Sequence, residues 1–233
     1  MAEILTYALD GSTAVVTMDD GKANALSNDM IDGLLAALTR AETEAKAMVL
    51  AGRAERFCAG FDLKVMMSGP ANATALLTRG SELLLRLYAA KVPLVIACTG
   101  HALAGGALVV LTGDVRIAAQ GAFKLGLNEV SIGLPVPVLA MELARDRLVK
   151  TELDRATLMA QIYAPDDAKR AGYVDEVVAP GEVVARAKAE AARLGAFGQH
   201  PFRATKQRLR GATIKYIRET MASDMATLLT PQP

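Results

Sequence analysis

The sequence is poor in the residues that build metal centres, disulfide frameworks and large aromatic surfaces. Its 233 residues include two cysteines, two histidines and no tryptophan, and aromatic residues make up 4% of the chain. Cys58 and Cys98 stand far apart and form no CxxC pair, so neither a zinc site nor a disulfide framework is indicated. His101 and His200 are too few for a metal centre built from histidines.

An excess of charge of one sign is also lacking. The formal net charge is +1, which removes any global attraction to nucleic acid or acidic membranes and leaves only local patches. The most membrane-like stretch, residues 92–111, is interrupted by a proline, a threonine, a histidine and three glycines, so it predicts a buried strand, a turn and a buried helix. The first residues carry Glu3 and Asp10 and no basic start, unlike a signal peptide. We therefore expect a cytoplasmic protein that does not enter the membrane.

What the chain does contain is an alternation of β-prone runs and helical patterns. Hydrophobic residues make up 52% of it, and a chain of this length buries roughly 70–75% of its unfolded surface. Strands are predicted at 4–8, 13–18, 47–52, 93–98 and 114–119, the first two joined by a hairpin turn at Asp10-Gly11. Helices are predicted at 29–46, 71–89 and 107–113. A loop is predicted at 53–62, where it runs into a short helix, and a turn at 100–106. This alternation favours an α/β fold with parallel strands and crossover helices.

Beyond Pro135 and Pro137 the pattern becomes mostly helical, with one strand-like run at 173–178. Helices are predicted at 138–150, 151–160, 166–172, 182–195 and 204–229. No linker rich in glycine and serine separates the two halves, which predicts one folded unit. Within it we distinguish a core of residues 1–195 from a C-terminal helical segment, 196–233, suited to oligomerisation.

Two short loops share one design, in which a strand ends, small residues follow and a helix begins. They are Cys58-Ala59-Gly60-Phe61-Asp62 and Leu103-Ala104-Gly105-Gly106. A helix N-terminus offers unpaired N–H groups and the positive end of the helix dipole. Two such ends that converge on one carbonyl oxygen would stabilise an oxyanion. Small residues at such turns also simply let elements approach each other, so neither loop decides the matter alone.

Four motifs stand in one register: NALS (24–27), RFCAGFDL (56–63), GHALAGGALVVLTGDVRIA (100–118) and GLNEVSIGLP (126–135). Their order and spacing resemble those of the crotonase, or enoyl-CoA hydratase/isomerase, family over about residues 4–215. The resemblance implies a spiral of repeated ββα units whose C-terminal helices build a homotrimer or a hexamer of two trimers. The family binds acyl-CoA thioesters and holds an enolate with two backbone N–H groups. In this chain those groups would belong to Phe61 and Gly105.

The same resemblance assigns the residues that contact coenzyme A, which is part of the substrate rather than a cofactor. Ala59, Gly60, Asp62 and Leu63 would run beside it, as would the segment that contains Lys22, Ala23 and Ala25. Lys22 and Lys206 become candidates for its phosphates. No metal or redox cofactor is implied, because the thioester itself carries the activation.

The family's glutamate positions separate two reactions. Its hydratases use two glutamates, and the positions of this chain that match them are Leu108 and Glu129. A leucine offers a water molecule no partner, whereas a single desolvated glutamate suits the movement of a proton from one carbon to another. The aliphatic residue at 108 followed by GLNE resembles the 3,2-enoyl-CoA isomerases of the family. The resemblance therefore implies conversion of 3-enoyl-CoA to trans-2-enoyl-CoA with Glu129 as base, Leu108 as an apolar wall, and Asn128 as a residue that either orients Glu129 or occupies a turn.

Two alternatives stay open at this point. The first is an enoyl-CoA hydratase or another lyase of the family. The second is a CoA-binding protein without catalysis, or an RNA-associated one. A basic run in the C-terminal segment, formed by Arg203, Lys206, Arg208, Arg210, Lys215 and Arg218, bears on the latter. Because Tyr216 is the one aromatic residue within 203–218, a surface for CoA phosphates or for another subunit is preferred to nucleic acid.

Overall fold

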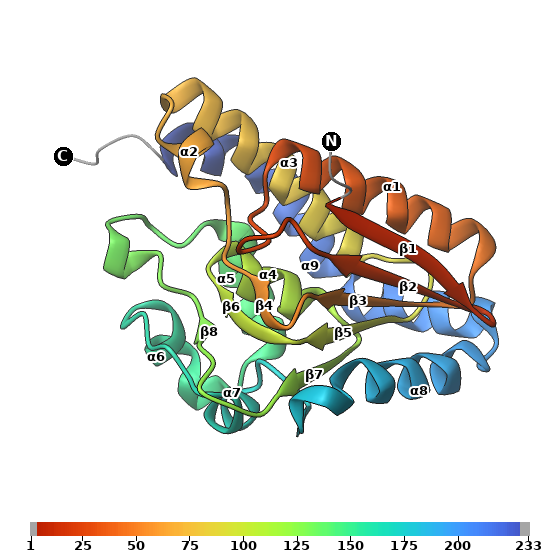
Figure 1. The fold of residues 1–233 in the computed structure, drawn as a ribbon. Helices are drawn as coiled ribbons and strands as arrows, with labels where there is room; N and C mark the ends of the chain where they lie inside the picture. Colours follow the sequence, from red (N-terminus) through yellow and green to blue (C-terminus); the bar gives the residue numbers. More distant parts are fainter. Residues whose placement is uncertain (1–3, 229–233) are drawn as a thin grey trace.

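A computed structural model describes residues 4–228 (Figure 1). The strands are β1 Leu5–Asp10, β2 Thr13–Met18, β3 Ala47–Gly52, β4 Glu55–Cys58, β5 Leu94–Cys98, β6 Gly100–Leu103, β7 Val115–Ala119, β8 Leu125–Gly126 and β9 Glu176–Val178. The α-helices are α1 Asn28–Glu44, α2 Leu63–Met66, α3 Pro70–Tyr88, α4 Gly105–Thr112, α5 Val138–Arg147, α6 Leu153–Thr157, α7 Pro165–Ala171, α8 Val183–Gly195 and α9 Gln199–Leu228. Short 3-10 helices occur at η1 Val130–Ile132, η2 Lys150–Glu152 and η3 Pro180–Glu182.

Within residues 4–228, six strands form the larger sheet in the order β1-β2-β3-β5-β7-β9. β1 and β2 make the predicted hairpin, in which Asp10 pairs with Thr13, and Gly11 in the turn adopts a φ of +58° that favours glycine. The pairings from β2 to β9 are parallel. Every residue of β3 is buried, as is typical of a parallel strand covered on both faces.

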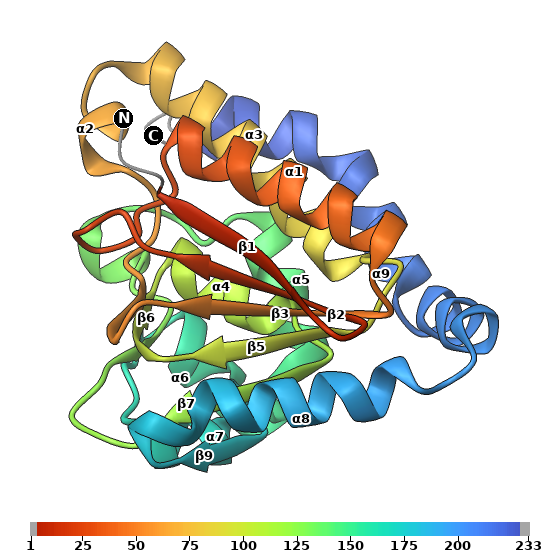
Figure 2. The same ribbon diagram turned by 45° about the vertical axis from the view of Figure 1, so that its right-hand side comes forward.

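Different helices cover the two faces of the larger sheet (Figure 2). On one face Val49 and Val95 pack in a cluster with Ala187 of α8. On the other face Leu50 and Ile96 belong to the main core, which also contains buried side chains of α1, α3 and α4. Successive residues of each strand point to opposite faces, so the same short runs serve both clusters.

A second, smaller sheet contains the parallel strands β4, β6 and β8 in that order. Along the chain, a strand of the larger sheet is followed by a strand of the smaller sheet and then by a helical segment. β3, β4 and the helices α2 and α3 form one such unit, and β5, β6 and α4 form the next. This succession confirms the predicted α/β spiral of ββα units.

Two strands of the smaller sheet differ from the sequence prediction. Residues 55–58 were expected in a loop and 100–103 in a turn, yet they form β4 and β6. Each strand has four residues and pairs with a segment distant in sequence, so neither a hairpin signal nor a long alternation marks it. A β-carbon at Gly100 would lie 2.6 Å from the backbone N of Arg56, so glycine there permits the close approach of the two strands.

The second half of the chain supplies helices that pack against this spiral. α9 contacts α5 and α3, and α8 lies along the larger sheet. α9 begins inside the predicted segment 196–233, of which residues 229–233 lie outside the described part. The division at residue 195 and the oligomerising role of this segment stay predictions.

The smaller sheet positions the candidate site. Because β4, β6 and β8 are neighbouring parallel strands, their C-terminal ends lie at the same edge. The chain that leaves this edge reaches Phe61 after β4, Gly105 after β6 and Glu129 after β8. The N–H of Ala104 donates to the carbonyl oxygen of Gly126 over 3.0 Å and ties two of these exits together. The fold thus gathers three residues that the sequence analysis singled out.

Candidate active site

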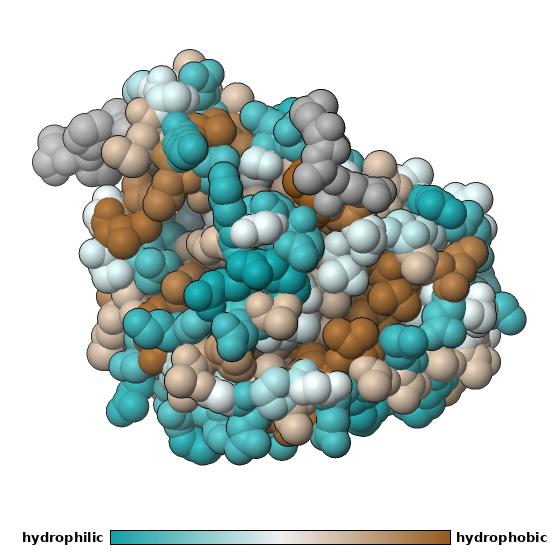
Figure 3. Space-filling model, viewed as in Figure 1, coloured by the Kyte–Doolittle hydropathy of each residue, from teal (hydrophilic) through white to brown (hydrophobic). Residues whose placement is uncertain are grey.

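A cavity of about 690 Å³ opens at this edge of the smaller sheet. Its volume is typical of sites for small molecules. In Figure 3 hydrophobic surface lies on both sides of a hollow between α2 and the segment 130–134. The apolar walls come largely from α2, α3 and the end of α9, and include Leu63, Met66, Met67, Ala73, Leu77 and Leu228.

Phe61 lines this cavity, and the hydrogen bonds of its neighbours set the direction of its own N–H. The N–H of Leu26 donates to the carbonyl oxygen of Gly60 over 2.8 Å, and the N–H of Asp62 donates to that of Leu26 over 3.3 Å. In such a parallel bridge the residue between the two bonded positions directs its N–H away from the partner strand. The Phe61 N–H therefore points away from Leu26 and has no hydrogen-bond partner within residues 4–228.

Gly105 supplies the second donor. It is the first residue of α4, where N–H groups have no intrahelical acceptor, and its N–H has no partner within the described chain. Ala104 before it has φ +48° and ψ −123°, a conformation that costs a residue with a side chain about 1–3 kcal/mol. Gly60, with φ +97°, lies so close that a β-carbon on it would be 3.3 Å from the N of Gly105. Two free N–H groups thus adjoin at the positive end of α4.

Glu129 also lines the cavity and is 8% exposed. Its Oε2 atom is buried and has no hydrogen-bond partner among the described residues. Burial raises the pKa of this carboxyl group above its ordinary value, and the backbone N–H groups of Glu129 and Asn128 oppose the shift. A desolvated carboxylate with a raised pKa and an unused oxygen has the properties of a general base.

The loop that carries Glu129 is fixed by its own hydrogen bonds. The N–H groups of Ile132 and Leu134 both donate to the carbonyl oxygen of Glu129 over 3.0 Å. The Ser131 hydroxyl donates to the carbonyl oxygen of Asn128 over 2.7 Å. Gly133, with φ +81°, closes η1 in a conformation that favours glycine. These bonds hold the backbone of residue 129, so its side chain keeps its direction toward the cavity.

Glu129 is the one ionisable residue among the described residues that line the cavity. Leu108, on the first turns of α4, contributes an apolar side chain to the same wall. Asn128 adds a polar one, and its buried Oδ1 has no partner in the part of the chain that the structure describes. The site therefore combines one base, two backbone donors and a largely apolar chamber.

The other predicted substrate-binding residues lie in two adjoining segments, with one exception. The N–H of Ala59 donates to the carbonyl oxygen of Ala23 over 3.0 Å, so the segments 22–25 and 59–63 run side by side. The Lys22 side chain is exposed, and its carbonyl oxygen accepts hydrogen bonds from Arg53. Asp62 caps α2 through a hydrogen bond from the N–H of Lys64.

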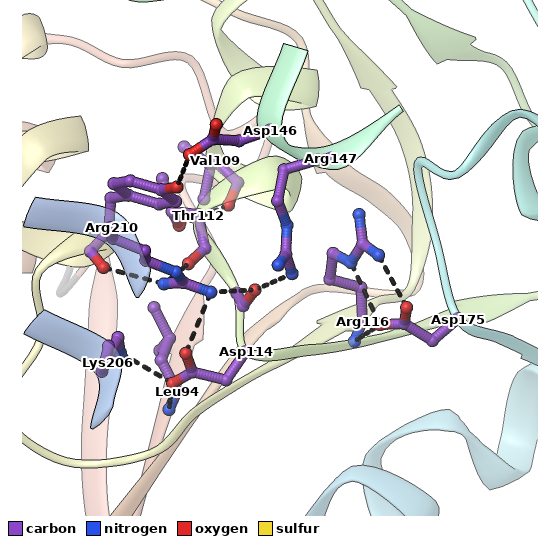
Figure 4. Close-up of polar contacts among 12 residues, drawn as sticks. Leu94, Val109, Thr112, Asp114, Arg116, Asp146, Arg147, Asp175, Lys206 and Arg210 are labelled. Atoms are coloured by element: carbon purple, nitrogen blue, oxygen red, sulfur yellow. Dashed lines mark hydrogen bonds and ion pairs between the residues drawn. The ribbon is translucent and has the colours of Figure 1, made fainter. Parts of the chain in front are cut away.

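Lys206 is the exception and requires a correction. It was expected at the CoA phosphates, but its side chain is 8% exposed and its ammonium group lies 2.7 Å from Asp114 (Figure 4). Burial lowers its pKa to about 8, although Asp114 opposes the shift. A buried lysine already paired with a carboxylate is not available to a phosphate in solvent.

Figure 4 shows that Lys206 belongs to a buried charged cluster. Arg210, one helical turn further along α9, lies 3.0 Å from the other oxygen of Asp114. Arg147 of α5 donates to the carbonyl oxygen of Gly113, which also accepts from Arg210. The basic run of the C-terminal segment is therefore split, because Lys206 and Arg210 are buried while Arg203 and Arg208 are exposed. A continuous basic surface for nucleic acid is not formed.

Most of the cavity wall was not predicted from the sequence. Within α3, Leu76, Leu83 and Leu84 pack in the main core, whereas Ala73 and Leu77 line the cavity. The contribution of Leu228 from the far end of the chain carried no local signal. The neighbouring methionines 66 and 67, which follow the motif RFCAGFDL after two residues, were the available hint, since methionine is common at adaptable apolar sites.

Residues 4–228 contain no cluster of three or more potential metal ligands. None of their helices is both long enough and apolar enough to cross a membrane.

Comparison with known proteins identifies the class of protein. A sequence profile of the enoyl-CoA hydratase/isomerase family matches residues 9–229. The human protein "Enoyl-CoA delta isomerase 1, mitochondrial" is 31% identical over 205 residues, which cover 86% of this chain and 68% of that protein. A probable enoyl-CoA hydratase of Bacillus subtilis is 32% identical over 201 residues, covering 81% and 75%. The crystal structure of an enoyl-CoA hydratase/isomerase family protein from Pseudomonas syringae matches with a TM-score of 0.94 and 36% identity, over 97% of this chain and 98% of that chain.

The chain therefore belongs to the enoyl-CoA hydratase/isomerase family and is an enzyme of that class. The named relatives include both an isomerase and a hydratase at similar identity. The choice between the two reactions must accordingly come from the residues of the site.

Proposed function

We propose that this enzyme is an enoyl-CoA isomerase that converts 3-enoyl-CoA to trans-2-enoyl-CoA. The observation that carries the proposal is the composition of the cavity, in which Glu129 is the one ionisable residue among the described lining residues and position 108 is leucine. One carboxylate suffices to carry a proton between two carbons, whereas hydration also needs a bound and activated water. Relatives of both kinds match at similar identity, so the lining residues alone carry this choice.

In the proposed reaction the thioester oxygen accepts hydrogen bonds from the N–H groups of Phe61 and Gly105. The Glu129 carboxylate takes a proton from C2, and the electron pair of that C–H bond forms a dienolate whose charge is held on the thioester oxygen. Protonated Glu129 then returns the proton to C4, which leaves the double bond between C2 and C3. No atom is gained or lost, so the proposal requires neither a metal nor a redox cofactor.

The surroundings of Glu129 fit this shuttle. Its raised pKa makes the carboxylate a stronger base than an exposed glutamate. Its unpartnered Oε2 is free to meet a proton on carbon. The fixed backbone of the loop keeps this oxygen available to both carbons without rearrangement of the chain.

The rest of the substrate has a place in the same arrangement. We assign the pantetheine and adenine of coenzyme A to the adjoining segments 22–25 and 59–63, with the exposed Lys22 near the phosphates. The acyl tail enters the apolar part of the cavity beside Leu63, Met66 and Leu77. Burial of an unbranched hydrocarbon tail there contributes roughly 25 cal/mol per Å² of apolar surface removed from water.

Hydration is the alternative, since a hydratase is among the relatives. It needs a group that holds the attacking water. At the position of the second glutamate Leu108 is 3% exposed and offers no hydrogen bond. Asn128 is the remaining polar side chain of the described wall, and an amide cannot supply general base catalysis to a water.

The test supplies 3-hexenoyl-CoA and follows the conjugated product in the ultraviolet. Wild-type enzyme is expected to form trans-2-hexenoyl-CoA, and Glu129→Gln is expected to lose about 10²–10⁴-fold in kcat while still binding the substrate. Glu142→Gln on α5 serves as the matched control, because residue 142 is not among the lining residues. Faster addition of water to crotonyl-CoA than isomerisation of 3-hexenoyl-CoA, or full activity of Glu129→Gln, would contradict the proposal.

We also propose that the enzyme is a cytoplasmic homotrimer or a hexamer of two trimers. Val149, Leu158 and Met159, around α6, are large apolar residues exposed in the single chain, which supports their burial between subunits. Analytical ultracentrifugation of the purified protein gives the mass directly. A monomer at micromolar concentration would contradict this assembly but would not affect the proposed role of Glu129 as the base.

A further inference from the structure

The ring of Phe61 lies between two glycines that belong to different helices. A β-carbon at Gly80, in the interior of α3, would lie 2.6 Å from Cζ of the ring and nearer still to Cε1. At the opposite edge of the ring, a β-carbon at Gly105 would lie 3.0 Å from Cε2 and 3.1 Å from Cδ2. Real β-carbons do not approach other atoms to less than 3.0 Å. The ring therefore occupies the space that any side chain at position 80 would need.

Glycine at position 80 is unfavourable on local grounds. Within a helix it is roughly 0.5–1 kcal/mol less stable than alanine. Gly80 is buried, and α3 carries leucines on both sides of it, at 76, 83 and 84, that pack in the main core. The local cost is therefore offset by what the missing side chain permits, which is contact between the aromatic ring and the helix backbone.

We propose that Gly80 is a positioning residue of the oxyanion hole, which acts by admitting the ring of Phe61 between α3 and α4. The ring of Phe61 contacts Gly105, and the backbone of Phe61 supplies the other donor. The position of the ring therefore sets the distance between the two N–H groups. A ring pushed off α3 moves the Phe61 N–H relative to the Gly105 N–H. This inference rests on the proposed function, since it concerns how the enolate is held.

The chain contains a matched control for this position. Gly33 lies in the interior of α1, and a β-carbon there would meet Leu5 Cδ1 at 3.8 Å, an ordinary contact. Gly33→Ala therefore adds the same methyl group to a helix without a collision. Both Gly80→Ala and Gly33→Ala increase helix propensity by the same amount. A difference between the two variants in kcat or in enolate fraction is therefore due to the collision of the new methyl group with the ring of Phe61.

Steady-state kinetics give the first readout. Gly80→Ala is expected to lower kcat for isomerisation by about 10- to 100-fold, somewhat less than the ~10²–10³-fold typical for complete loss of one oxyanion donor. KM is expected to change much less, because the donors act most strongly on the charge that develops in the transition state. Gly33→Ala is expected to keep the wild-type kcat. Urea unfolding of each variant confirms that the measured protein is folded.

Acetoacetyl-CoA gives a second readout, an equilibrium fraction of enolate, which does not depend on the rate of proton transfer by Glu129. Its enolate absorbs in the near ultraviolet, so the absorbance of the bound ligand measures how strongly the two N–H groups stabilise the anion. The wild type is expected to hold a larger enolate fraction than free solution at the same pH, and Gly80→Ala a smaller fraction than the wild type. Phe61→Leu combined with Gly80→Ala replaces the ring by a shorter side chain, so the double variant is expected to lose less than the product of the two single losses.

The outcomes separate the two claims. A wild type that does not favour the enolate would contradict the oxyanion hole, and with it both the proposed function and the role of Gly80. A wild type that favours the enolate, with Gly80→Ala equal to it in enolate fraction and kcat, would overturn the role of Gly80 alone. Strictly multiplicative losses in the double variant would also overturn it, because they would show that positions 61 and 80 act independently.

Discussion

Arg210 of α9 donates a hydrogen bond over 3.3 Å to the carbonyl oxygen of Thr112, the last residue of α4. The same guanidinium donates to the carbonyl oxygen of Tyr88 over 2.8 Å and lies 3.0 Å from Asp114. α4 begins at Gly105, so the helix that carries the free N–H of Gly105 at its first residue has a buried cation at its last. The cation complements the negative end of the helix dipole and satisfies carbonyl groups that have no intrahelical donor.

Arg210→Met is predicted to destabilise the protein strongly. The substitution leaves the carbonyl oxygens of Tyr88 and Thr112 without this donor and removes one of the two cations beside Asp114. Loss of one partner from a buried ion pair typically costs about 3–5 kcal/mol, which urea unfolding would measure at pH 7. Arg208→Met, two residues away and exposed, should stay within about 0.5 kcal/mol of the wild type. Equal effects of the two substitutions would show that the buried contacts of Arg210 contribute little.

The burial of Lys206 predicts that the free energy of unfolding depends on pH. Burial lowers its pKa in the folded protein to about 8, below the reference value of 10.5. Between these two values the unfolded chain binds more protons, so this group adds stability as the pH rises from about 8 to 10.5. The free energy of unfolding of the wild type minus that of Lys206→Met should therefore increase over this range.

The buried tyrosines and cysteines cancel in this difference because they are common to both proteins. Lys215→Met, an exposed lysine on the same helix, provides the comparison. A difference for Lys206→Met that stays flat between pH 8 and pH 10.5 would contradict a buried, destabilised ammonium group.

Glu129→Gln is predicted to be more stable than the wild type at neutral pH, although the proposed mechanism predicts that it loses most of its activity. Burial raises the pKa of the Glu129 carboxyl in the folded state above the unfolded value of about 4.5. The stability contributed by this group is therefore fully present below pH 4.5 and is lost as the pH rises through the folded pKa. Glutamine does not ionise, so the advantage of the variant should grow from pH 4.5 to pH 7.5 in chemical unfolding. The exposed Glu82→Gln should show no comparable gain.

The proposed role of Glu129 also predicts how kcat/KM falls at low pH. Glu129 must be ionised to take a proton, so kcat/KM for 3-hexenoyl-CoA should fall as the pH drops through its raised pKa. The midpoint of this fall should lie above the ordinary value of a glutamate. A midpoint at that ordinary value would mean that the base is exposed to solvent in the free enzyme.

Leu108→Glu is predicted to create measurable hydratase activity. It places a second carboxylate in the cavity wall, where it can hold and activate a water, and the rate of water addition to crotonyl-CoA should rise above that of the wild type. Isomerisation and stability should both fall, because the new charge is buried in a chamber that already holds Glu129. Leu108→Met conserves volume and should keep isomerase activity at a cost below about 1.5 kcal/mol. A folded Leu108→Glu enzyme without hydration would show that residue 108 does not decide between the two reactions.

Much of the architecture followed from local patterns. The apolar run 47–52 predicted β3 within its observed bounds, and the hairpin at Gly11 was marked by its turn residues. The segment 71–89 predicted α3 to within one residue at each end. These elements can be predicted from the sequence because a buried parallel strand needs continuous apolar residues and a packed helix needs an apolar face.

Which charged residues are buried and which are exposed could be determined only from the tertiary structure. Lys206 follows Arg203 and precedes Arg208 in what looks like one basic surface, yet a helix turns each residue by about 100° and divides them between core and solvent. Its partner Asp114 lies 92 positions away. No local pattern states which lysine of a helix will meet a distant carboxylate.

By itself the sequence determined the residues of the proposed site, which are one glutamate at 129, a leucine at 108 and small residues where two helices begin. It also determined the strands and helices whose apolar periodicity is local. The tertiary structure alone decided that β4, β6 and β8 end at one edge, that the ring of Phe61 sits between Gly80 and Gly105, and that Lys206 is buried. These relationships arise from pairing between segments remote in sequence, where the free energy comes from contacts that neither partner encodes alone.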